Sequence, residues 1–247
     1  MGLLDFLFGK KEETENKPTQ VSSRPISSPV SDAASNVASP RIEQCFDPVT
    51  FPISQVRVKK LGEIDLAPYD AFWYSSVPDA MLLPLFANTD KIKRFLPGMD
   101  FSSETAAKET LKGYMLRTEM GLGVTYVIRS QNIPMGMIFV NTPNYNQKAM
   151  NLYIWTVDFF MFEANEHQGI MFNCLAQVLA IMQQNFRVPK VYAIVNAANS
   201  DCINLLYNPR NPLFTEEDNF GFKDKDHPGS APRVFSIDLR KINFRHA

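Results

Sequence analysis

Apolar residues recur at intervals of three and four between positions 170 and 186, and this is the clearest pattern in the chain. The spacing places their side chains on one face and predicts a helix that packs against a core. We expect Asn165 to cap this helix and its first turn to begin near residues 166–167, with Gly169 inside that turn. Pro189 is expected to end the helix.

Alternating or continuously apolar runs predict strands on both sides of this helix. The predicted strands span residues 53–60, 124–129, 133–140, 152–162, 191–195 and 234–239. Residues 152–162 are the longest run of β-branched and aromatic side chains, so we expect that strand at the centre of the sheet. Gln131 and Asn132 are expected to form a two-residue turn between the second and third strands.

Capping residues indicate two shorter helices. A serine at position 102 or 103 can cap a helix that runs to about Glu119, and Asn199 or Ser200 can cap a short helix through Tyr207. An N-cap side chain accepts a hydrogen bond from a backbone N–H that the helix itself leaves unpaired, which is why these residue types mark helix starts.

The remaining segments favour a broken helix and a loop. Prolines interrupt residues 70–86, which favour two short helical pieces, and residues 142–149 favour a polar loop. The predicted order is one strand, two helical regions, three strands, a helix, a strand, a helix and a strand. It indicates an α+β fold with a mostly antiparallel central sheet, flanking helices and one βαβ crossover.

Residues 1–46 are predicted to be a disordered tail, and residues 47–247 a single folded domain. Proline, serine and charged residues dominate positions 12–41, and such a stretch buries too little apolar surface to offset the entropy lost on ordering. Residues 2–8 are apolar but too few to span a bilayer. They leave open a weak contact with a membrane or a partner groove, or no role at all.

Charge and cysteine content argue against several classes of protein. The formal net charge is −1, so no global attraction to nucleic acid or an anionic membrane is expected. The three cysteines and three histidines are scattered, which argues against a disulfide scaffold and predicts no metal site. No secretory signal is recognisable, so the cytoplasm is the expected compartment.

The junction between residues 152–162 and the following helix is where we expect the chemistry. Backbone N–H groups at the start of a helix have no partner within it, and the helix dipole favours an anion there. Gly169 has no side chain, so a phosphate can approach this backbone closely. The loop is neither a GxGxxG motif nor a P-loop, so the sequence argues against dinucleotide and Walker-type sites. A single glycine at a helix start can instead be a tight packing point, and this alternative stays open.

Four local features carry a resemblance to a known family. They are the segment Ile133–Ile138, the strand end Phe159–Met161, the loop Glu166–Met171, and Asn199–Cys202 followed by Gly221-Phe222. With them the chain resembles the GNAT superfamily of acyl-CoA-dependent N-acetyltransferases from about Val56 to Leu239. It looks most like the branch that includes the ribosomal-protein N-terminal acetyltransferases.

This resemblance implies a GNAT-like fold and a site for acetyl-CoA as co-substrate. The cofactor-binding residues that it implies are Phe159, Phe160, Met161, His167, Gln168, Gly169, Ile170, Met171 and Asn199. Residues 159–161 would pair with the pantetheine, the amides of 167–171 would hold the pyrophosphate, and Asn199 would orient the pantetheine arm or the adjacent backbone. Tyr207 would protonate the departing thiolate.

Transfer to an amine requires that amine to lose a proton, so a base is expected near the cleft. Glu163 follows the central strand at the mouth of the expected cleft and is a candidate base, and Glu166 and Asp158 are further candidates from their positions. We therefore predict an N-acetyltransferase that moves an acetyl group from acetyl-CoA to a primary amine by direct attack. The acceptor amine belongs to a small molecule or to a protein N-terminus.

The alternative is a catalytically inactive GNAT-like binding module, tethered to a partner or a membrane by its N-terminal tail. Glu166 stands where the family has Arg or Gln, and Met171 where it has Gly or Ala. A carboxylate beside a pyrophosphate is electrostatically unfavourable unless it points away. A cleft filled by side chains such as Trp155 would favour the module. The sequence also leaves open whether the protein forms a homodimer.

Overall fold

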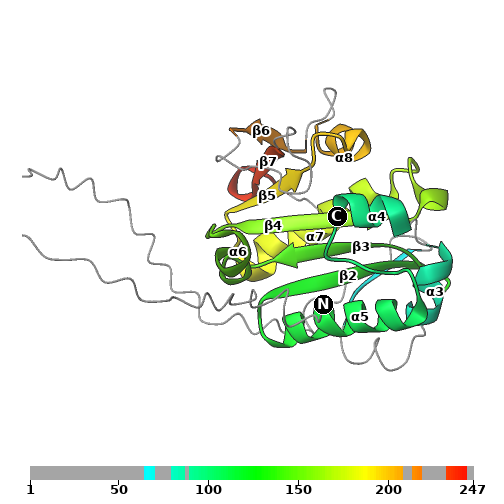
Figure 1. Ribbon diagram of the computed structural model, residues 1–247. Coiled ribbons are helices and arrows are strands. Elements are labelled where there is room, and N and C mark those ends of the chain that lie inside the picture. The colour runs from blue at the N-terminus through cyan, green and yellow to red at the C-terminus, as the bar shows by residue number, and fades with distance from the viewer. Residues whose placement is uncertain (1–63, 70–78, 87–88, 208–212, 219–231, 244–247) are drawn as a thin grey trace, which may run out of the picture. The chain divides into compact units, whose positions relative to one another are not determined.

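The computed structural model describes residues 64–69, 79–86, 89–207, 213–218 and 232–243 (Figure 1). The predicted tail 1–46, the domain boundary at residue 47 and the predicted strand 53–60 lie outside these residues. Residues 70–78 of the predicted helical region and the pair Gly221-Phe222 also lie outside them.

Seven strands in this part of the chain form one sheet, in the order β1–β2–β3–β4–β5–β7–β6. They are β1 (Ile64–Pro68), β2 (Gly123–Ser130), β3 (Ile133–Asn141), β4 (Trp155–Met161), β5 (Lys190–Val195), β6 (Thr215–Glu217) and β7 (Arg233–Asp238). Neighbouring strands are antiparallel except β4 and β5, which are parallel. The predicted α+β class, the mostly antiparallel sheet and the βαβ crossover are therefore confirmed.

The hairpin of β2 and β3 turns at Gln131 and Asn132, whose φ angles are 49° and 68°. Two consecutive left-handed residues are what a type I′ turn requires, so the predicted two-residue turn is confirmed. The sequence pattern does not predict β1 and β6. With five and three residues, they have too few alternating positions to stand out from the surrounding chain.

Helices cover both faces of the sheet (Figure 1). They are α3 (Asp79–Phe86), α4 (Thr89–Phe95), α5 (Glu104–Glu119), α6 (Pro143–Met150), α7 (Ile170–Phe186) and α8 (Ser200–Leu206), with the short 3₁₀ helices η2 (Glu163–Asn165) and η3 (Leu239–Lys241). α7 packs against one face, and α3 and α5 pack against the other. No helix in the described ranges is long and apolar enough to cross a lipid bilayer.

Alternate side chains of β3 divide between two apolar cores. Ile138 and Val140 pack in the core under α7, whereas Met137 and Phe139 pack in the core under α3 and α5. Because successive residues of a strand point to opposite faces, this one strand contributes to both layers. The sheet is thus covered by apolar side chains on both faces at this strand.

Two predicted helix caps are confirmed. The Ser103 hydroxyl accepts a hydrogen bond from the Ala106 N–H at 3.1 Å, and Asn199 Oδ1 accepts one from the Cys202 N–H at 3.2 Å. The helix that Asn199 caps ends one residue earlier than predicted, because Tyr207 is its C-cap.

The predicted start of α7 is wrong. The helix begins at Ile170 instead of near residues 166–167, and Gly169 is its N-cap rather than a residue of its first turn. Asn165 ends η2 and does not cap α7. The φ angles of His167 and Gly169 are 61° and 74°, and a right-handed helix cannot pass through residues in this left-handed region.

Helix α6 occupies the segment predicted to be a polar loop. Thr142 caps it by accepting a hydrogen bond from the Tyr145 N–H at 3.3 Å, and Pro143 takes its first position. Asn151 ends it in the left-handed conformation. These are ordinary start and stop signals, but few of its residues are apolar, so its periodicity does not reveal a helix.

Three further boundaries differ from the prediction. β4 is central as predicted, but it begins at Trp155 rather than at residue 152 and is shorter than β3. Pro84 does not break the chain into two helical pieces, because α3 continues through it. Leu83 beside it is 1% exposed, and this packing offsets the hydrogen bond that proline cannot make. α4 is not predicted at all.

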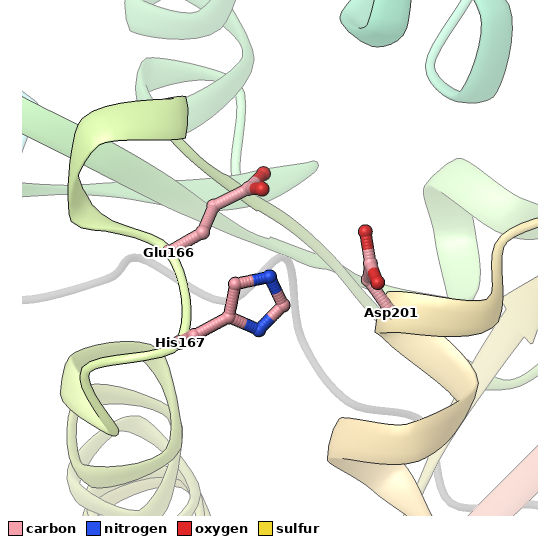
Figure 2. A group of neighbouring side chains, drawn as sticks. All are labelled: Glu166, His167 and Asp201. Carbon is pink, nitrogen blue, oxygen red and sulfur yellow. The ribbon is translucent and has the colours of Figure 1, made fainter.

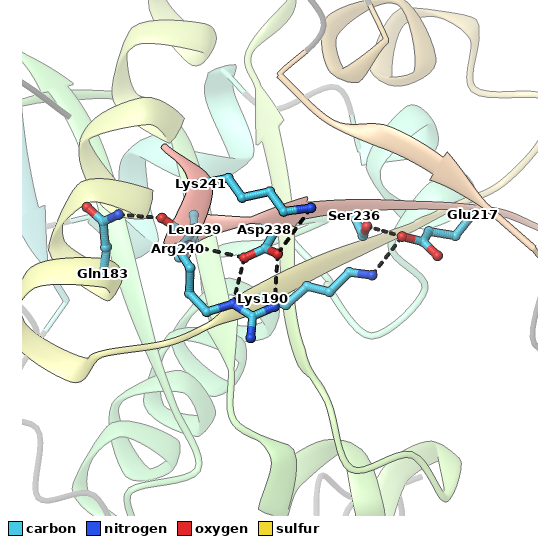
Figure 3. Close-up of polar contacts among 8 residues, drawn as sticks. All are labelled: Gln183, Lys190, Glu217, Ser236, Asp238, Leu239, Arg240 and Lys241. Carbon is cyan, nitrogen blue, oxygen red and sulfur yellow. Dashed lines mark hydrogen bonds and ion pairs between the residues drawn. The ribbon is translucent and has the colours of Figure 1, made fainter. Parts of the chain in front are cut away.

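Polar contacts fix the strands on the far side of β5 (Figure 3). Lys190 Nζ donates to Glu217 Oε1 at 2.7 Å, and the Ser236 hydroxyl donates to the same oxygen, so β5, β6 and β7 are tied together. Gln183 of α7 donates through Nε2 to the carbonyl oxygen of Leu239. Together these contacts hold β5 on the side that faces away from β4.

A buried ion pair joins β2 to α3. The Arg129 and Asp79 side chains are each 1% exposed and form two hydrogen bonds, of which the one from Nη1 to Oδ1 is 2.6 Å long. Each charge gives up its hydration on burial, and only a partner in good geometry compensates for that loss. The pair therefore fixes where α3 sits against the sheet.

We expect Asp79→Ala to lower the free energy of unfolding by about 3–5 kcal/mol, because the Arg129 charge then stays buried without this carboxylate. Urea titration at neutral pH measures the change. The more exposed pair of Arg233 and Glu216 supplies the control, since Glu216→Ala should cost less than about 1 kcal/mol. Equal losses from the two substitutions would contradict the special role of the buried pair.

Candidate functional site

β4 and β5 separate along their length. They pair only at Trp155–Val191 and Thr156–Tyr192, near the start of each strand. Beyond this point β4 stays paired with β3, and β5 stays paired with β7, so a gap opens inside the sheet. Backbone groups along both edges of the gap are positioned to bond an extended ligand.

A pocket of about 660 Å³ occupies this gap, a volume typical of small-molecule sites. Its walls come from β4, β5, α8, α4 and the start of α7. All nine residues predicted to bind the cofactor line it, namely Phe159, Phe160, Met161, His167, Gln168, Gly169, Ile170, Met171 and Asn199. Trp155 does not fill the cleft, because its side chain is 5% exposed in the core and is not part of the lining.

The N-terminal end of α7 meets the pocket at Gly169. The φ angle of Gly169 is +74°, and a Cβ at this position would meet no heavy atom within 4 Å. The backbone angle rather than crowding therefore favours glycine here, and the space in front of it is open. The unpaired N–H groups of this 17-residue helix and the positive end of its dipole favour an anion there.

The side chains beside Gly169 serve the structure of the loop and the core. Gln168 Nε2 donates to the Ala164 carbonyl oxygen at 3.0 Å, which closes the loop between η2 and α7. Met171 is 4% exposed and packs in the core under α7. A methionine at a position where the resemblance implies glycine or alanine is thus accommodated by packing.

Lys91 of α4 neutralises two carboxylates of the pocket lining. Its Nζ lies 2.7 Å from Glu166 Oε1, 2.8 Å from Glu166 Oε2 and 3.1 Å from Asp201 Oδ2. Burial alone would lower the pKa of Lys91, but its hydrogen bonds to the two carboxylates outweigh that effect and raise the pKa. These bonds join α4, the loop before α7, and α8 around the pocket.

Glu166, His167 and Asp201 converge on one point (Figure 2), with their ligand atoms within 4.8 Å of one another. Such a group has the residue types of a divalent metal site. However, the Lys91 ammonium already bonds both carboxylates, and its positive charge would repel a metal ion at this distance. We therefore interpret the group as an ion-pair network.

Asp158 lines the pocket from the side of the sheet that α5 covers. Asn141 Nδ2 donates a hydrogen bond to Asp158 Oδ2 at 2.7 Å. Burial raises the pKa of the Asp158 carboxyl above its usual value, although the Asn141 hydrogen bond and the Arg117 charge oppose that rise. A carboxyl in a pocket whose pKa is raised toward neutrality has the properties of a proton acceptor.

The structure does not bring Glu163 and Tyr207 to this pocket. Glu163 is an exposed residue of η2, and Tyr207 is 44% exposed at the end of α8. Neither lines the pocket, whereas Asn199 lines it while capping α8. The roles that the sequence suggests for Glu163 and Tyr207 stay predictions.

The two cysteines in the described ranges carry protonated thiols at neutral pH. Cys202 lines the pocket, and Cys174 lies in the core under α7. Burial raises the pKa of each thiol to about 12. A thiolate nucleophile is therefore not available at this site near pH 7.

The sequence does not identify three side chains that organise the site, Lys91, Arg117 and Asn141. No motif connects Lys91 with Glu166, because 75 positions separate them in the chain. The one available signal for Asn141 is an amide at the end of an otherwise apolar strand, followed by a Thr-Pro helix start. That signal indicates the end of a strand, but it does not indicate which side chains Asn141 contacts.

Solved structures of acetyltransferases share this fold. One is the acetyltransferase from Salmonella typhimurium that modifies the N-terminal serine of ribosomal protein L7/L12, with 17% identity and a TM-score of 0.54 over 71% of this chain and 95% of that chain. Another is RimJ from Mycobacterium smegmatis in complex with CoA-disulfide, with 13% identity and a TM-score of 0.53 over 72% of this chain and 83% of that chain.

A third is the ribosomal-protein-S5-alanine acetyltransferase from Vibrio fischeri, with 10% identity and a TM-score of 0.55 over 74% of this chain and 97% of that chain. At these identities the likeness concerns the fold. No curated protein matches the chain significantly. The family model described as "Acetyltransferase (GNAT) domain" matches residues 76–207, which is more than half of the chain. The chain therefore belongs to the GNAT acetyltransferase family.

Proposed function

We propose that this GNAT protein is an N-acetyltransferase that moves an acetyl group from acetyl-CoA to a primary amine by direct attack. The observation that carries the proposal is the pocket between the separated strands β4 and β5, which ends at the open N-terminus of α7. An extended edge followed by a cluster of free amides suits a ligand with an amide-containing arm and a pyrophosphate.

The residues present fit coenzyme A. The backbone of residues 159–161 would hold the pantetheine arm, and the amides at the start of α7 would hold the pyrophosphate, next to the open space in front of Gly169. Asn199 would contact the arm from α8. Acetyl-CoA supplies an acetyl thioester, whose carbonyl carbon an amine can attack.

Asp158 is the proton acceptor in this proposal. An α-amino group has a pKa near 8, so most acceptor molecules arrive as ammonium ions and must lose a proton before they can attack. The Asp158 carboxylate attracts the ammonium ion and can then take its proton, because burial makes this carboxyl more basic than an exposed one. Glu163 and Tyr207 lie outside the pocket lining and so have weaker support for a direct role.

Direct attack is supported by the state of the pocket thiol. An acetyl-enzyme intermediate would need an ionised nucleophile, and burial raises the pKa of Cys202 to about 12. Both substrates would then bind together. For the acceptor we propose only its chemical class, a primary amine of a protein N-terminus or of a small molecule. The first possibility is supported by the structurally similar Salmonella typhimurium protein, which modifies an N-terminal serine.

Calorimetry of the full chain with acetyl-CoA tests the proposal at its first step. We expect binding, and we expect Gly169→Val to weaken it at least tenfold, because the side chain strains the left-handed backbone and covers the free amides. Absence of binding up to about 1 mM acetyl-CoA would overturn the proposal. Binding without transfer to any amine in an acceptor panel would instead favour the inactive binding module.

We expect Asp158→Asn to lower kcat/KM for acetyl transfer by about 100-fold or more, because the amide cannot accept a proton. In the unchanged protein, kcat/KM should fall as the pH drops through the raised pKa of Asp158, since protonation removes the base. Glu163→Gln and Tyr207→Phe serve as comparisons and should reduce kcat/KM less.

Loss of folding would not explain this result. A carboxyl whose pKa is raised in the folded state destabilises the fold at pH values above that pKa, so Asp158→Asn should unfold at the same or a higher temperature at pH 7. A Glu163→Gln or Tyr207→Phe defect larger than that of Asp158→Asn would assign the proton transfer elsewhere.

Lys91→Met should raise the dissociation constant for acetyl-CoA about fivefold, which corresponds to about 1 kcal/mol for a partly exposed ion pair. The substitution leaves Glu166 and Asp201 without this cation beside the phosphates. Lys93→Met is the matched control, because Lys93 of the same helix pairs with Asp100 and does not line the pocket. Equal affinities of the two variants would contradict the neutralising role of Lys91.

A further inference from the structure

Arg117 of α5 is clamped between two aromatic rings next to the site. Its guanidinium carbon lies 4.6 Å from the ring centre of Tyr114 and 4.1 Å from the ring centre of Tyr145. Tyr114 comes from the same helix and Tyr145 from α6. A planar cation held between two ring faces has little freedom to rotate, so the direction of its N–H groups is fixed.

The guanidinium in turn fixes the side-chain amide of Asn141. Arg117 Nη1 donates to Asn141 Oδ1 at 3.0 Å, and Asn141 Nδ2 donates to Asp158 Oδ2 at 2.7 Å and to Thr156 Oγ1 at 3.2 Å. Arginine has only donors, so the amide oxygen must face it. The NH₂ group of Asn141 is then the part that faces the carboxylate.

We propose that Arg117 is a positioning residue: it orients Asn141 so that the amide donates to Asp158, and its positive charge favours the carboxylate form that receives the proton of the acceptor amine. The inference rests on the proposed acetyl transfer. Arg117 does not line the pocket, so it acts through Asn141 and not on a substrate.

Several groups from four neighbouring elements face Asp158. They are Tyr114 and Arg117 of α5, Asn141 of β3, Tyr145 of α6 and Cys202 of α8. Burial raises the pKa of both tyrosines and of the thiol, so all three are neutral at pH 7. Among these groups, Arg117 is the one that carries a charge.

The sign of the effect follows from this arrangement. A positive charge and a donated hydrogen bond both favour the ionised carboxylate, and burial opposes them. Without Arg117 the amide of Asn141 can also turn its oxygen toward Asp158, which would favour the protonated carboxyl further. Removal of Arg117 should therefore raise the pKa of Asp158.

The test uses the full chain and two measurements. The first follows the carboxyl carbon of Asp158 by NMR as the pH is changed, and the second follows the pH dependence of kcat/KM. We expect Arg117→Met to move the Asp158 titration and the acid limb of kcat/KM upward together, by about one pH unit. Lys112→Met removes a positive charge from the exposed side of the same helix and should move neither.

An unchanged Asp158 titration in Arg117→Met would overturn the proposal, as would an equal shift in Lys112→Met. If Arg117→Met does not fold, Asn141→Leu takes its place, because it removes the amide that links the two charges and keeps the number and branching of the side-chain heavy atoms. The same upward shift is expected there, and an unshifted titration would overturn the proposal equally.

The role of Arg117 and the acetyl transfer can be disproved separately. An upward shift of the NMR titration in a protein that transfers no acetyl group supports the control of Asp158 by Arg117 and removes the proposed function. A working acetyltransferase whose acid limb and Asp158 titration ignore Arg117→Met keeps the proposed function and removes the role of Arg117.

Discussion

The separation of β4 from β5 is the constraint on which the other features of this protein depend. Each strand is held on its outer side, β4 by β3 and β5 by β7, so the two need not pair with each other beyond Thr156–Tyr192. The gap exposes backbone edges, brings the start of α7 to the pocket and admits side chains from both faces of the sheet. A fully paired sheet would have none of these features, because its interior would be closed by hydrogen bonds.

Much of the fold can be predicted from the sequence, because its strongest elements are locally encoded. The apolar period of α7 predicts that helix, and Gln131-Asn132 predicts the turn of the hairpin. The sequence pattern does not predict α6, because this helix is stabilised by a cap, a proline and a few contacts and has little apolar repeat. The sequence predicts the start of α7 too early, because the left-handed backbone angles of His167 and Gly169 prevent a helix from starting at the plausible cap Asn165.

The candidate site divides in the same way. Its backbone component, the strand end and the free amides beside Gly169, can be predicted because neighbouring residues along the chain form it. Its charged component cannot be predicted in this way. A carboxylate at Glu166 is compatible with an anion site only because Lys91, from a helix distant in the sequence, neutralises it. The position of Asp158 next to Phe159 is enough to make it a candidate base. Only the structure distinguishes it from Glu163, because Asp158 lines the pocket and Glu163 does not.

Two arginine–aspartate pairs in this protein differ in whether the two side chains bond directly. One pair supports the fold, and the other belongs to the proposed site. Arg129 bonds Asp79 directly through two hydrogen bonds, and because both side chains are buried this pair serves to fix α3 against β2. Between Arg117 and Asp158 stands the amide of Asn141, which accepts a hydrogen bond from the guanidinium and donates one to the carboxylate. With the amide interposed, burial raises the pKa of Asp158 in spite of the nearby cation, and in our proposal this lets the carboxyl take up and release a proton during each turnover.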